Sequence, residues 1–220
     1  MTAPTYDTLT TDDTGADKIL TTGTVTALDQ NPVSIAQRGT DAPVVQVPVR
    51  EYKTSGTGAT WPIHDGVTAF NIILQGGGGG TNGDGGSTTF TYNSVTYTAA
   101  GGTKGTANGP YGVGGTTTNG DTESVSGQDG AAAGVVIGGS SMMGHGGVLS
   151  ANGSSSGSGY GQGSAFAAVG PVVYAGGAGG TLRKRIAVVS GQTTGTFTVG
   201  AAGSAGSGAA GGAGLIIFEY

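Results

Sequence analysis

The chain has 220 residues and a formal net charge of −5. Its few charges are spread out, which argues against the Lys/Arg stripe of a nucleic-acid groove, and the absence of Cys excludes disulfides, thiolate catalysis and zinc–thiolate sites. Only 35% of the residues are hydrophobic and 10% are charged; Gly, Thr and Ser make up the difference from an average globular domain.

Residues 1–50 predict an extended N-terminal arm or a small β unit. Short β-prone stretches occur around Val25 and Val45, and the prolines at 32, 43 and 48 exclude long helices. The N-terminus has neither the positive region nor the apolar region of a secretory signal. Residues 165–180, the closest approach to a membrane segment, contain Pro171 and are too short, so we expect no membrane insertion.

Residues 51–220 predict a glycine-rich β domain. Residues 67–74 give the strongest strand pattern, which ends abruptly at a run of five glycines, 76–80. Further strand patterns predict a hairpin from residues 90–92 and 95–97, a hairpin from residues 186–189 and 196–199, and a last strand at 215–218. No stretch shows helical periodicity. The expected fold is all-β, with short antiparallel strands arranged like a sandwich that bracket long, sharply turning glycine-rich loops.

The glycines are concentrated in the distal part of the chain. Six of the 49 lie in the first 75 residues and the other 43 lie between Gly76 and Gly214. In that block 15 Gly–Gly pairs are three residues apart, against about 13 expected by chance, so a global collagen-like repeat is not predicted. The three-residue spacing does persist locally, as in the runs 77–86, 109–115, 200–206 and 208–214. Short polyglycine II segments that pair through their backbones are therefore a local hypothesis.

Chemistry-bearing motifs are scarce. Matches to G-x-G-x-x-G carry no information in this background, and no match follows a strand and opens a helix. Residues 79–84 approach a calcium-binding glycine–aspartate repeat, but the spacing is wrong, and a solvated turn is the preferred interpretation of Asp84. His64 and His145 are too few for a metal cluster. We therefore expect no enzyme, no metal site and no cofactor.

A few large side chains stand alone among the glycines and are the candidate binding residues. Because glycine exposes its neighbours, an isolated aromatic or Met side chain can present an apolar surface to a sugar ring or a partner. The candidates for receptor binding are Tyr111, Met142, Met143, His145 and Tyr160. The alternative is that each side chain folds back to cap a thin core; for Tyr111, Tyr160 and His145 the two interpretations are balanced, and for the two Met residues and for Phe166 capping is favoured.

Residues 183–185, Arg-Lys-Arg, form the only basic cluster. They come just before a predicted strand, and a solvated strand end is the favoured interpretation. The alternative is a contact for phosphate groups on a glycan or a partner.

The order of these features resembles the glycine-rich domains of tailed-bacteriophage tail fibres and adhesins. The resemblance covers roughly residues 52–220 and is most specific at the C-terminal end, where residues 186–199, a Gly-Ala-Gly run and the closing strand at 215–218 follow one another. It implies a non-catalytic virion protein that assembles as a homotrimer and recognises a host surface glycan or outer-membrane protein through its loops, with residues 1–50 contacting other virion proteins.

Two other functions are weighed against receptor binding. The first is a structural virion component, such as a head fibre or decoration protein, in which the glycine-rich body serves as packing or spacer. The second is an ice-binding protein, which would need regular triplets and a flat Thr or Ala face; the spacing of the glycines argues against it.

Overall fold

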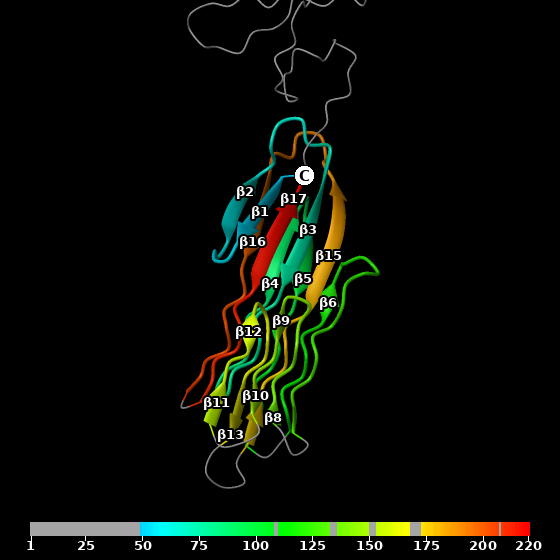
Figure 1. Ribbon diagram of the computed structural model, residues 1–220. Helices are drawn as coiled ribbons and strands as arrows, with labels where there is room; N and C mark the ends of the chain where they lie inside the picture. Colours follow the sequence, from blue (N-terminus) through cyan, green and yellow to red (C-terminus); the bar gives the residue numbers. More distant parts are fainter. Residues whose placement is uncertain (1–48, 108–109, 133–135, 150–152, 168–172, 207) are drawn as a thin grey trace, which may run out of the picture. The chain divides into compact units, whose positions relative to one another are not determined.

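The computed structural model describes residues 49–107, 110–132, 136–149, 153–167, 173–206 and 208–220 (Figure 1). The chain divides into two units, Met1–Val47 and Pro48–Tyr220, and all described residues belong to the second. The β-prone stretches expected near Val25 and Val45 lie outside the described residues. Every regular element that the structure describes is a β-strand, and all paired strands are antiparallel, so the all-β prediction is confirmed.

Two sheets face each other in a sandwich at one end of the unit (Figure 1). The first sheet has the order β1 (Arg50–Lys53), β17 (Leu215–Glu219), β3 (Ala69–Gln75) and β15 (Thr181–Ala187). The second has the order β2 (Ala59–Pro62), β16 (Thr194–Thr198), β4 (Thr88–Tyr92), β5 (Val95–Ala99) and β6 (Thr117–Thr118). The first and last described residues meet here, since Val49 N donates to Tyr220 O at 2.8 Å.

The sandwich core follows from alternation along the strands. In β3 the side chains of Phe70, Ile72 and Leu74 are buried on one face, as expected for a strand with one face against a core. They pack with aromatic residues of both sheets, and Trp61 stacks on Phe218 with ring centroids 4.0 Å apart. Each such side chain contributes about 1.5–3 kcal/mol when fully buried, so this cluster is the main hydrophobic contribution to the stability of the unit.

Two predicted strands and one predicted hairpin are confirmed. The strands expected at 67–74 and 215–218 correspond to β3 and β17, and the hairpin of 90–92 with 95–97 corresponds to β4 and β5. The turn of that hairpin holds Asn93 and Ser94 at φ 46° and 63°, the two positive values that a tight two-residue turn requires.

The second predicted hairpin is wrong. Residues 181–187 form β15, which pairs with β3 in the first sheet, whereas residues 194–198 form β16, which pairs with β2 and β4 in the second. Both strands bury apolar side chains, Ile186 and Phe197, from opposite sides of the same core. The connection therefore crosses from one sheet to the other instead of closing a hairpin.

Below the sandwich the strands continue into a bundle of glycine-rich segments (Figure 1). Strands β3, β5 and β16 run into residues 76–80, 100–103 and 200–203, and residues 83–86, 175–180 and 211–214 run back into β4, β15 and β17. The space between the two sheets narrows along this direction, because the inward side chains change from Trp61 and Phe90 to Leu74 and Ala99 and then to glycine. Without side chains the segments approach to backbone hydrogen-bonding distance.

Residues 76–80 occupy the centre of this bundle. Gly76 N and Gly79 N both donate to the segment 175–180, at 2.9 Å to Gly180 O and 2.8 Å to Gly177 O. Gly77 N donates to Gly86 O and Gly78 N donates to Gly212 O, so every third N–H group of the segment points to the same neighbouring segment. In a β-strand, every second N–H group points to the same neighbour. The three-residue return is the geometry of a polyglycine II helix, in which no hydrogen bond forms within the segment.

The carbonyl groups of the central segment complete its surroundings. Gly77 O, Gly78 O and Gly79 O accept hydrogen bonds from Gly102 N, Gly203 N and Ser164 N, at 2.9, 2.9 and 3.0 Å. Donors and acceptors together connect the central segment to six neighbouring segments. The predicted backbone pairing between local polyglycine II segments is thus confirmed, and the block expected to consist of long loops is instead a packed bundle.

The central segment tolerates no side chain. A Cβ atom built on any residue from Gly76 to Gly80 would lie 1.8–2.2 Å from a carbonyl oxygen of another segment. These contacts also repeat after three residues, since Gly76 and Gly79 both face residues 100–103. Five consecutive glycines are required here because the segment has neighbours on all sides.

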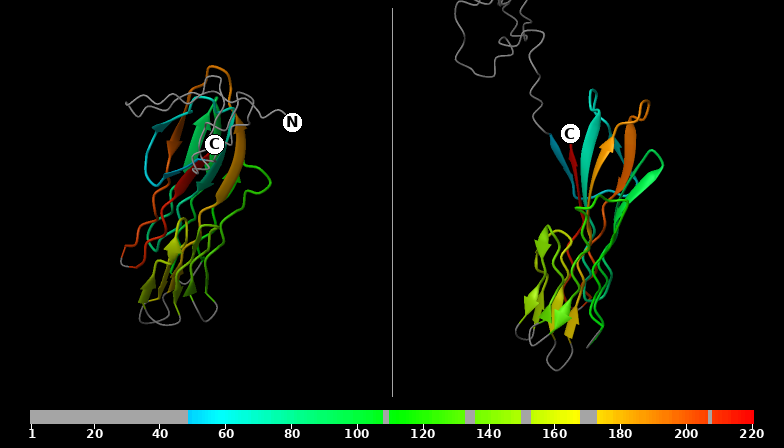
Figure 2. Two further views of the ribbon diagram at one scale, coloured as in Figure 1. Left: turned by 45° about the horizontal axis from the view of Figure 1, so that its top comes forward. Right: turned by 90° about the vertical axis from the view of Figure 1, so that its right-hand side faces the viewer.

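The remaining strands are short and belong to the glycine-rich part (Figure 2). One sheet has the order β10 (Val148–Leu149), β8 (Val136–Ile137) and β7 (Ala131–Ala132), and another has the order β11 (Gly153–Ser155), β13 (Ala165–Ala167) and β14 (Val173–Ala175). The two-residue strands β9 (Gly144–His145) and β12 (Ser158–Gly159) pair with each other. Strands β8, β10, β11 and β13 lie at the end of the unit away from the C-terminus (Figure 1).

Candidate functional site

Four of the five candidate receptor-binding residues lie on one small two-stranded element, here called the Met142 hairpin (residues 141–145 and 158–160). Ser141 N donates to Gly144 O at 2.8 Å, which closes a tight turn with Met142 and Met143 at its tip. The Ser141 hydroxyl donates to Tyr160 O at 2.5 Å, and Tyr160 N donates to Met143 O at 3.1 Å. These backbone contacts fix the turn and leave the side chain of Met142 52% exposed.

His145 is held at the base of the same hairpin. It pairs with Ser158 across the two strands, and its Nε2 atom lies 2.7 Å from the Ser158 hydroxyl. The side chain is exposed, whereas those of Met143 and Tyr160 are half-buried. The hairpin therefore carries two thioethers, an imidazole and a phenol, and of these the side chains of Met142 and His145 are exposed. Met and aromatic side chains of this kind form adaptable apolar contacts with a partner.

Tyr111 and Phe166 lie elsewhere. Tyr111 is half-buried and packs against a small apolar cluster that includes Val136 and Ala175. Phe166 pairs with Tyr174 at a centroid distance of 5.8 Å. For Tyr111 the described contacts are those expected of a residue that caps a thin core, the alternative interpretation given above.

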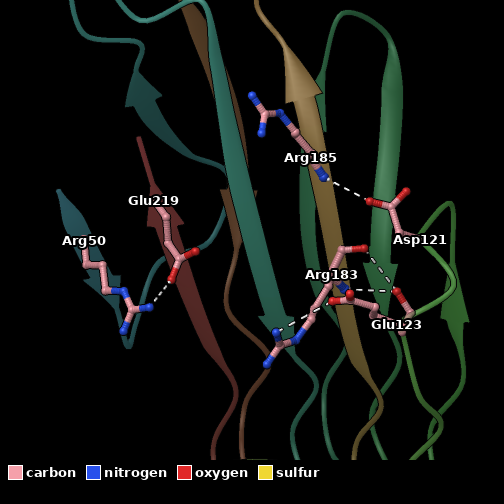
Figure 3. A network of polar contacts seen from close by, with 7 residues as sticks. Arg50, Asp121, Glu123, Arg183, Arg185 and Glu219 are labelled. Atoms are coloured by element: carbon pink, nitrogen blue, oxygen red, sulfur yellow. Dashed lines mark hydrogen bonds and ion pairs between the residues drawn. The ribbon is translucent and has the colours of Figure 1, made fainter. Parts of the chain in front are cut away.

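The structure also forms a groove of about 330 Å³ that the sequence did not indicate, here called the arginine groove (Figure 3). It lies on the outer face of the first sheet, where Asn71 and Ile73 of β3 alternate with the buried Ile72 and Leu74. The pairing of β15 with β3 places Arg185 beside Asn71 and Arg183 beside Ile73, and the pairing of β17 with β3 places Glu219 on the other side of Asn71. Residues 121–123 complete the lining.

Neighbouring charges pair around the groove. Arg50 Nη2 lies 2.8 Å from Glu219 Oε1, and Lys184 Nζ lies 2.6 Å from Asp121 Oδ1. The hydrogen bonds from the Lys184 side chain and from the backbone of Arg185 lower the pKa of Asp121. The hydrogen bond to Asp121 in turn raises the pKa of Lys184. Arg183 is loosely associated with Glu123, at 3.9 Å. Among the described residues, no carboxylate lies within 4.0 Å of the Arg185 guanidinium, which points away from the pairs (Figure 3).

The basic cluster is therefore divided by the strand. Arg183 and Arg185 face outward along the groove, while Lys184 shares the face of the buried Ile72 and closes the side of the sandwich against Asp121. The strand end favoured from the sequence is wrong, because residues 183–185 lie in the middle of β15. The alternation of side chains along β15 would have placed the two arginines on one face of the strand and Lys184 on the other. No local pattern in the sequence indicates which strands lie beside β15.

The arginine groove and the Met142 hairpin lie on the same side of the unit (Figures 1 and 2). Gln75 follows Ile73 on the outer face of β3, and Gly161, the residue after Tyr160, packs directly on the Gln75 side chain. Two residues of a strand span about 7 Å, so the hairpin begins close to the end of the groove. Together they form one surface, next to the junction of sandwich and bundle.

A second polar cluster surrounds Glu51 near the C-terminus. Its carboxylate lies 2.8 Å from His64 Nε2, accepts a hydrogen bond from the Tyr220 hydroxyl at 2.7 Å, and lies 3.0 Å from Lys53 Nζ. Burial raises the pKa of Glu51, but the hydrogen bonds from Tyr220, Lys53 and His64 outweigh it and lower the pKa to about 2. Burial and the Glu51 contact raise the pKa of Tyr220 to about 12. This cluster joins β1 to the C-terminal residue.

The described ranges contain no group of three or more His, Cys, Asp or Glu side chains placed to hold a metal ion. Asp84, considered for calcium, instead accepts a hydrogen bond from Lys104 N at 2.7 Å, next to the turn in which Gly80 N donates to Gly83 O. Within these ranges there is also no helix with the length and hydrophobicity needed to cross a membrane. No protein-family model, curated protein or solved structure matches this chain.

Proposed function

We propose that this chain is a virion fibre or adhesin protein that recognises a host surface glycan or outer-membrane protein without catalysis. The observation that carries the proposal is the glycine bundle continuing directly from six strands of the sandwich. A bundle of backbone hydrogen bonds in every lateral direction resists bending, which is the property required of a protein that holds a recognition surface away from a particle.

The two ends of the unit have different roles in this proposal. Val49 and Tyr220 pair at the sandwich end. Residues 1–50 would contact other virion proteins. The short strands β8, β10, β11 and β13 lie at the opposite end of the bundle (Figure 1).

The Met142 hairpin is the part of the described surface best suited to a first contact. Met142 is 52% exposed at the tip of a turn whose backbone is fixed by Ser141 and Tyr160. A fixed turn loses little conformational entropy on binding, so the contact area of its side chains is used efficiently. His145 and Tyr160 add polar groups beside the apolar tip.

An adsorption assay with purified protein tests the proposal. The intact chain should compete with phage particles for host cells, and the double substitution of Met142 and Met143 by Ser should reduce this competition by tenfold or more. Val189→Ser is the matched control, because Val189 is 42% exposed and lies two residues beyond Ala187, at the end of β15 that is farther from the glycine bundle. Competition that is unchanged in the double variant would remove the hairpin from the recognition surface.

Localisation on the particle tests the function independently of the site. Antibodies against residues 49–220 should label the tail tip or fibres in electron micrographs, and sedimentation of the purified chain should give the mass of a trimer. Labelling of the capsid lattice, together with failure to compete for adsorption, would contradict receptor binding and favour a head fibre or decoration protein.

A further inference from the structure

The arginine groove combines a charged wall with a floor that is half polar and half apolar. Two rows of side chains cross the outer face of the first sheet: Glu219, Asn71 and Arg185 form one row, and Ile217, Ile73 and Arg183 form the next. From this arrangement we propose that the groove binds a carboxylate-bearing saccharide. This inference rests on the proposed function, because it assigns the chemical class of the host glycan.

Arg185 supplies the anion contact. Arg50 is engaged with Glu219 at 2.8 Å and Lys184 with Asp121 at 2.6 Å, whereas Arg185 has no ion-pair partner within 4.0 Å in the described part of the chain. The 3.9 Å separation of Arg183 from Glu123 leaves this second guanidinium able to turn toward a ligand. A planar guanidinium binds a carboxylate through two parallel hydrogen bonds, which makes arginine the residue suited to this recognition.

The carboxylates of the groove distinguish a sugar from other anions. Glu123, which lies 3.9 Å from Arg183, lines the same groove and would repel a ligand that carries only negative charge, such as an acidic peptide; Glu219 lines it as the partner of Arg50. Saccharide hydroxyl groups, by contrast, donate hydrogen bonds to carboxylates and to the Asn71 side-chain carbonyl. A uronate-type sugar supplies both one anion and several O–H donors.

Ile73 accounts for the apolar part of the floor. The C–H face of a pyranose ring is apolar, and it can lie on the half-buried Ile73 side chain while the hydroxyls at its rim reach polar neighbours. The groove volume of about 330 Å³ is at the lower end of the range of about 300–1,000 Å³ for small-molecule sites, which fits one or two sugar residues and not a protein interface. The remainder of a longer glycan would extend toward the Met142 hairpin.

A glycan array tests the assignment with the full-length chain. The array carries neutral oligosaccharides and matched oligosaccharides that contain uronate or sialate, and inorganic phosphate serves as a soluble competitor at low ionic strength. We expect retention on the carboxylated glycans alone. Arg185→Gln should weaken that retention by tenfold or more, as expected for the loss of a charge-assisted contact, whereas Lys104→Gln, which removes a charge outside the groove, should change it less than twofold.

Three results would overturn the proposal: no retention on carboxylated glycans, equal retention of the Arg185→Gln variant, or displacement by inorganic phosphate at the same concentration as by a free uronate tetrasaccharide. The last result would identify a general anion site. Adsorption of phage to host cells is measured separately. If the wild-type protein does not bind the array but competes normally with phage for host cells, only the groove assignment is wrong. If the wild-type protein does not compete, the proposed function is wrong.

Discussion

The replacement Gly78→Ala tests the central claim about the bundle, that its middle segment has no room for a side chain. A Cβ at this position would lie 1.8 Å from Gln162 O and 2.3 Å from Gln162 C, both backbone atoms that cannot rotate away. Relief requires the neighbouring segment to move by more than 1 Å. Three hydrogen bonds lie in its path: Gly78 N to Gly212 O, Gly212 N to Gln162 O, and Gly203 N to Gly78 O.

The expected loss follows from these contacts. Three backbone hydrogen bonds at about 1 kcal/mol each, with about 1–3 kcal/mol for overpacking, give about 4–6 kcal/mol. A domain of this size changes its Tm by about 2–4 °C per kcal/mol, so the variant should melt on the order of 10–20 °C below the wild type. The fluorescence of the buried Trp61 in the sandwich reports the transition, because β3 connects the two parts.

Gly191→Ala is the matched control for this experiment. Gly191 has φ +82° but no atom within 4 Å of a built Cβ, so alanine there meets backbone strain alone, about 1–2 kcal/mol. Its Tm should fall by only a few degrees. A Gly78→Ala protein that melts within about 3 °C of the Gly191→Ala protein would refute the steric argument and with it the packed bundle.

Three further changes probe other parts of the unit. The pKa of Glu51 is about 2 against 4.5 for the free side chain, so its contribution to stability is complete above pH 4.5 and disappears as the pH falls toward 2; Glu51→Gln should flatten the decline in urea-unfolding free energy between pH 5 and 2, and an unchanged decline would contradict the role of this carboxylate. The buried Gln75 donates to three carbonyl oxygens and accepts from the Thr181 hydroxyl, so Gln75→Leu should lower the free energy of unfolding by about 2–4 kcal/mol, measured by thermal unfolding. If the effects of Gln75→Leu and Thr181→Val simply add in the double variant, the two side chains are not coupled. His145→Ala should leave stability within about 0.5 kcal/mol in the same assay while weakening adsorption, because its contact with Ser158 is exposed; a large loss of stability would instead assign His145 a structural role.

The strands of the sandwich could be predicted from local pattern and their partners could not. Apolar, β-prone runs marked residues 67–74 and 215–218, and the short turn at Asn93 and Ser94 fixed one hairpin. The strands around Ile186 and Phe197 show the same local pattern, yet they belong to opposite sheets. Alternation indicates which side chains face a core and leaves open from which side they reach it.

The spacing of the glycines averaged over residues 76–214 does not reveal the bundle. Its segments are short and are separated by turns, some of which reset the three-residue period. At the turn where Gly208 N donates to Ala205 O, for example, the run 200–206 ends and the run 208–214 begins out of step with it. Outer segments also need glycine only where they face a neighbour, which allows Ala201 and Ala202 to be exposed between the buried Gly200 and Gly203. The most direct signal was the run of five glycines at 76–80, because only a segment enclosed on all sides needs glycine at every position.

The residues proposed for recognition come together only in part. Isolation among glycines singled out four residues that the structure gathers on the Met142 hairpin, whereas Tyr111, chosen on the same ground, packs on a small apolar cluster. The arginine groove escaped prediction because Asn71, Arg185 and Glu219 become neighbours only through the strand order β17-β3-β15. That order is set by long-range packing and has no local signature.

The three-residue return of the central segment has a consequence for how such a protein can change in length. A polyglycine II helix advances about 3.1 Å per residue with three residues per turn, so inserting three residues moves the end of a segment outward by about 9 Å while every amide still faces its original neighbour. Insertions of one or two residues rotate all later amides onto the wrong neighbours. Repeated triplet insertion across neighbouring segments would therefore extend the bundle in uniform steps, with the sandwich and the surface residues retained.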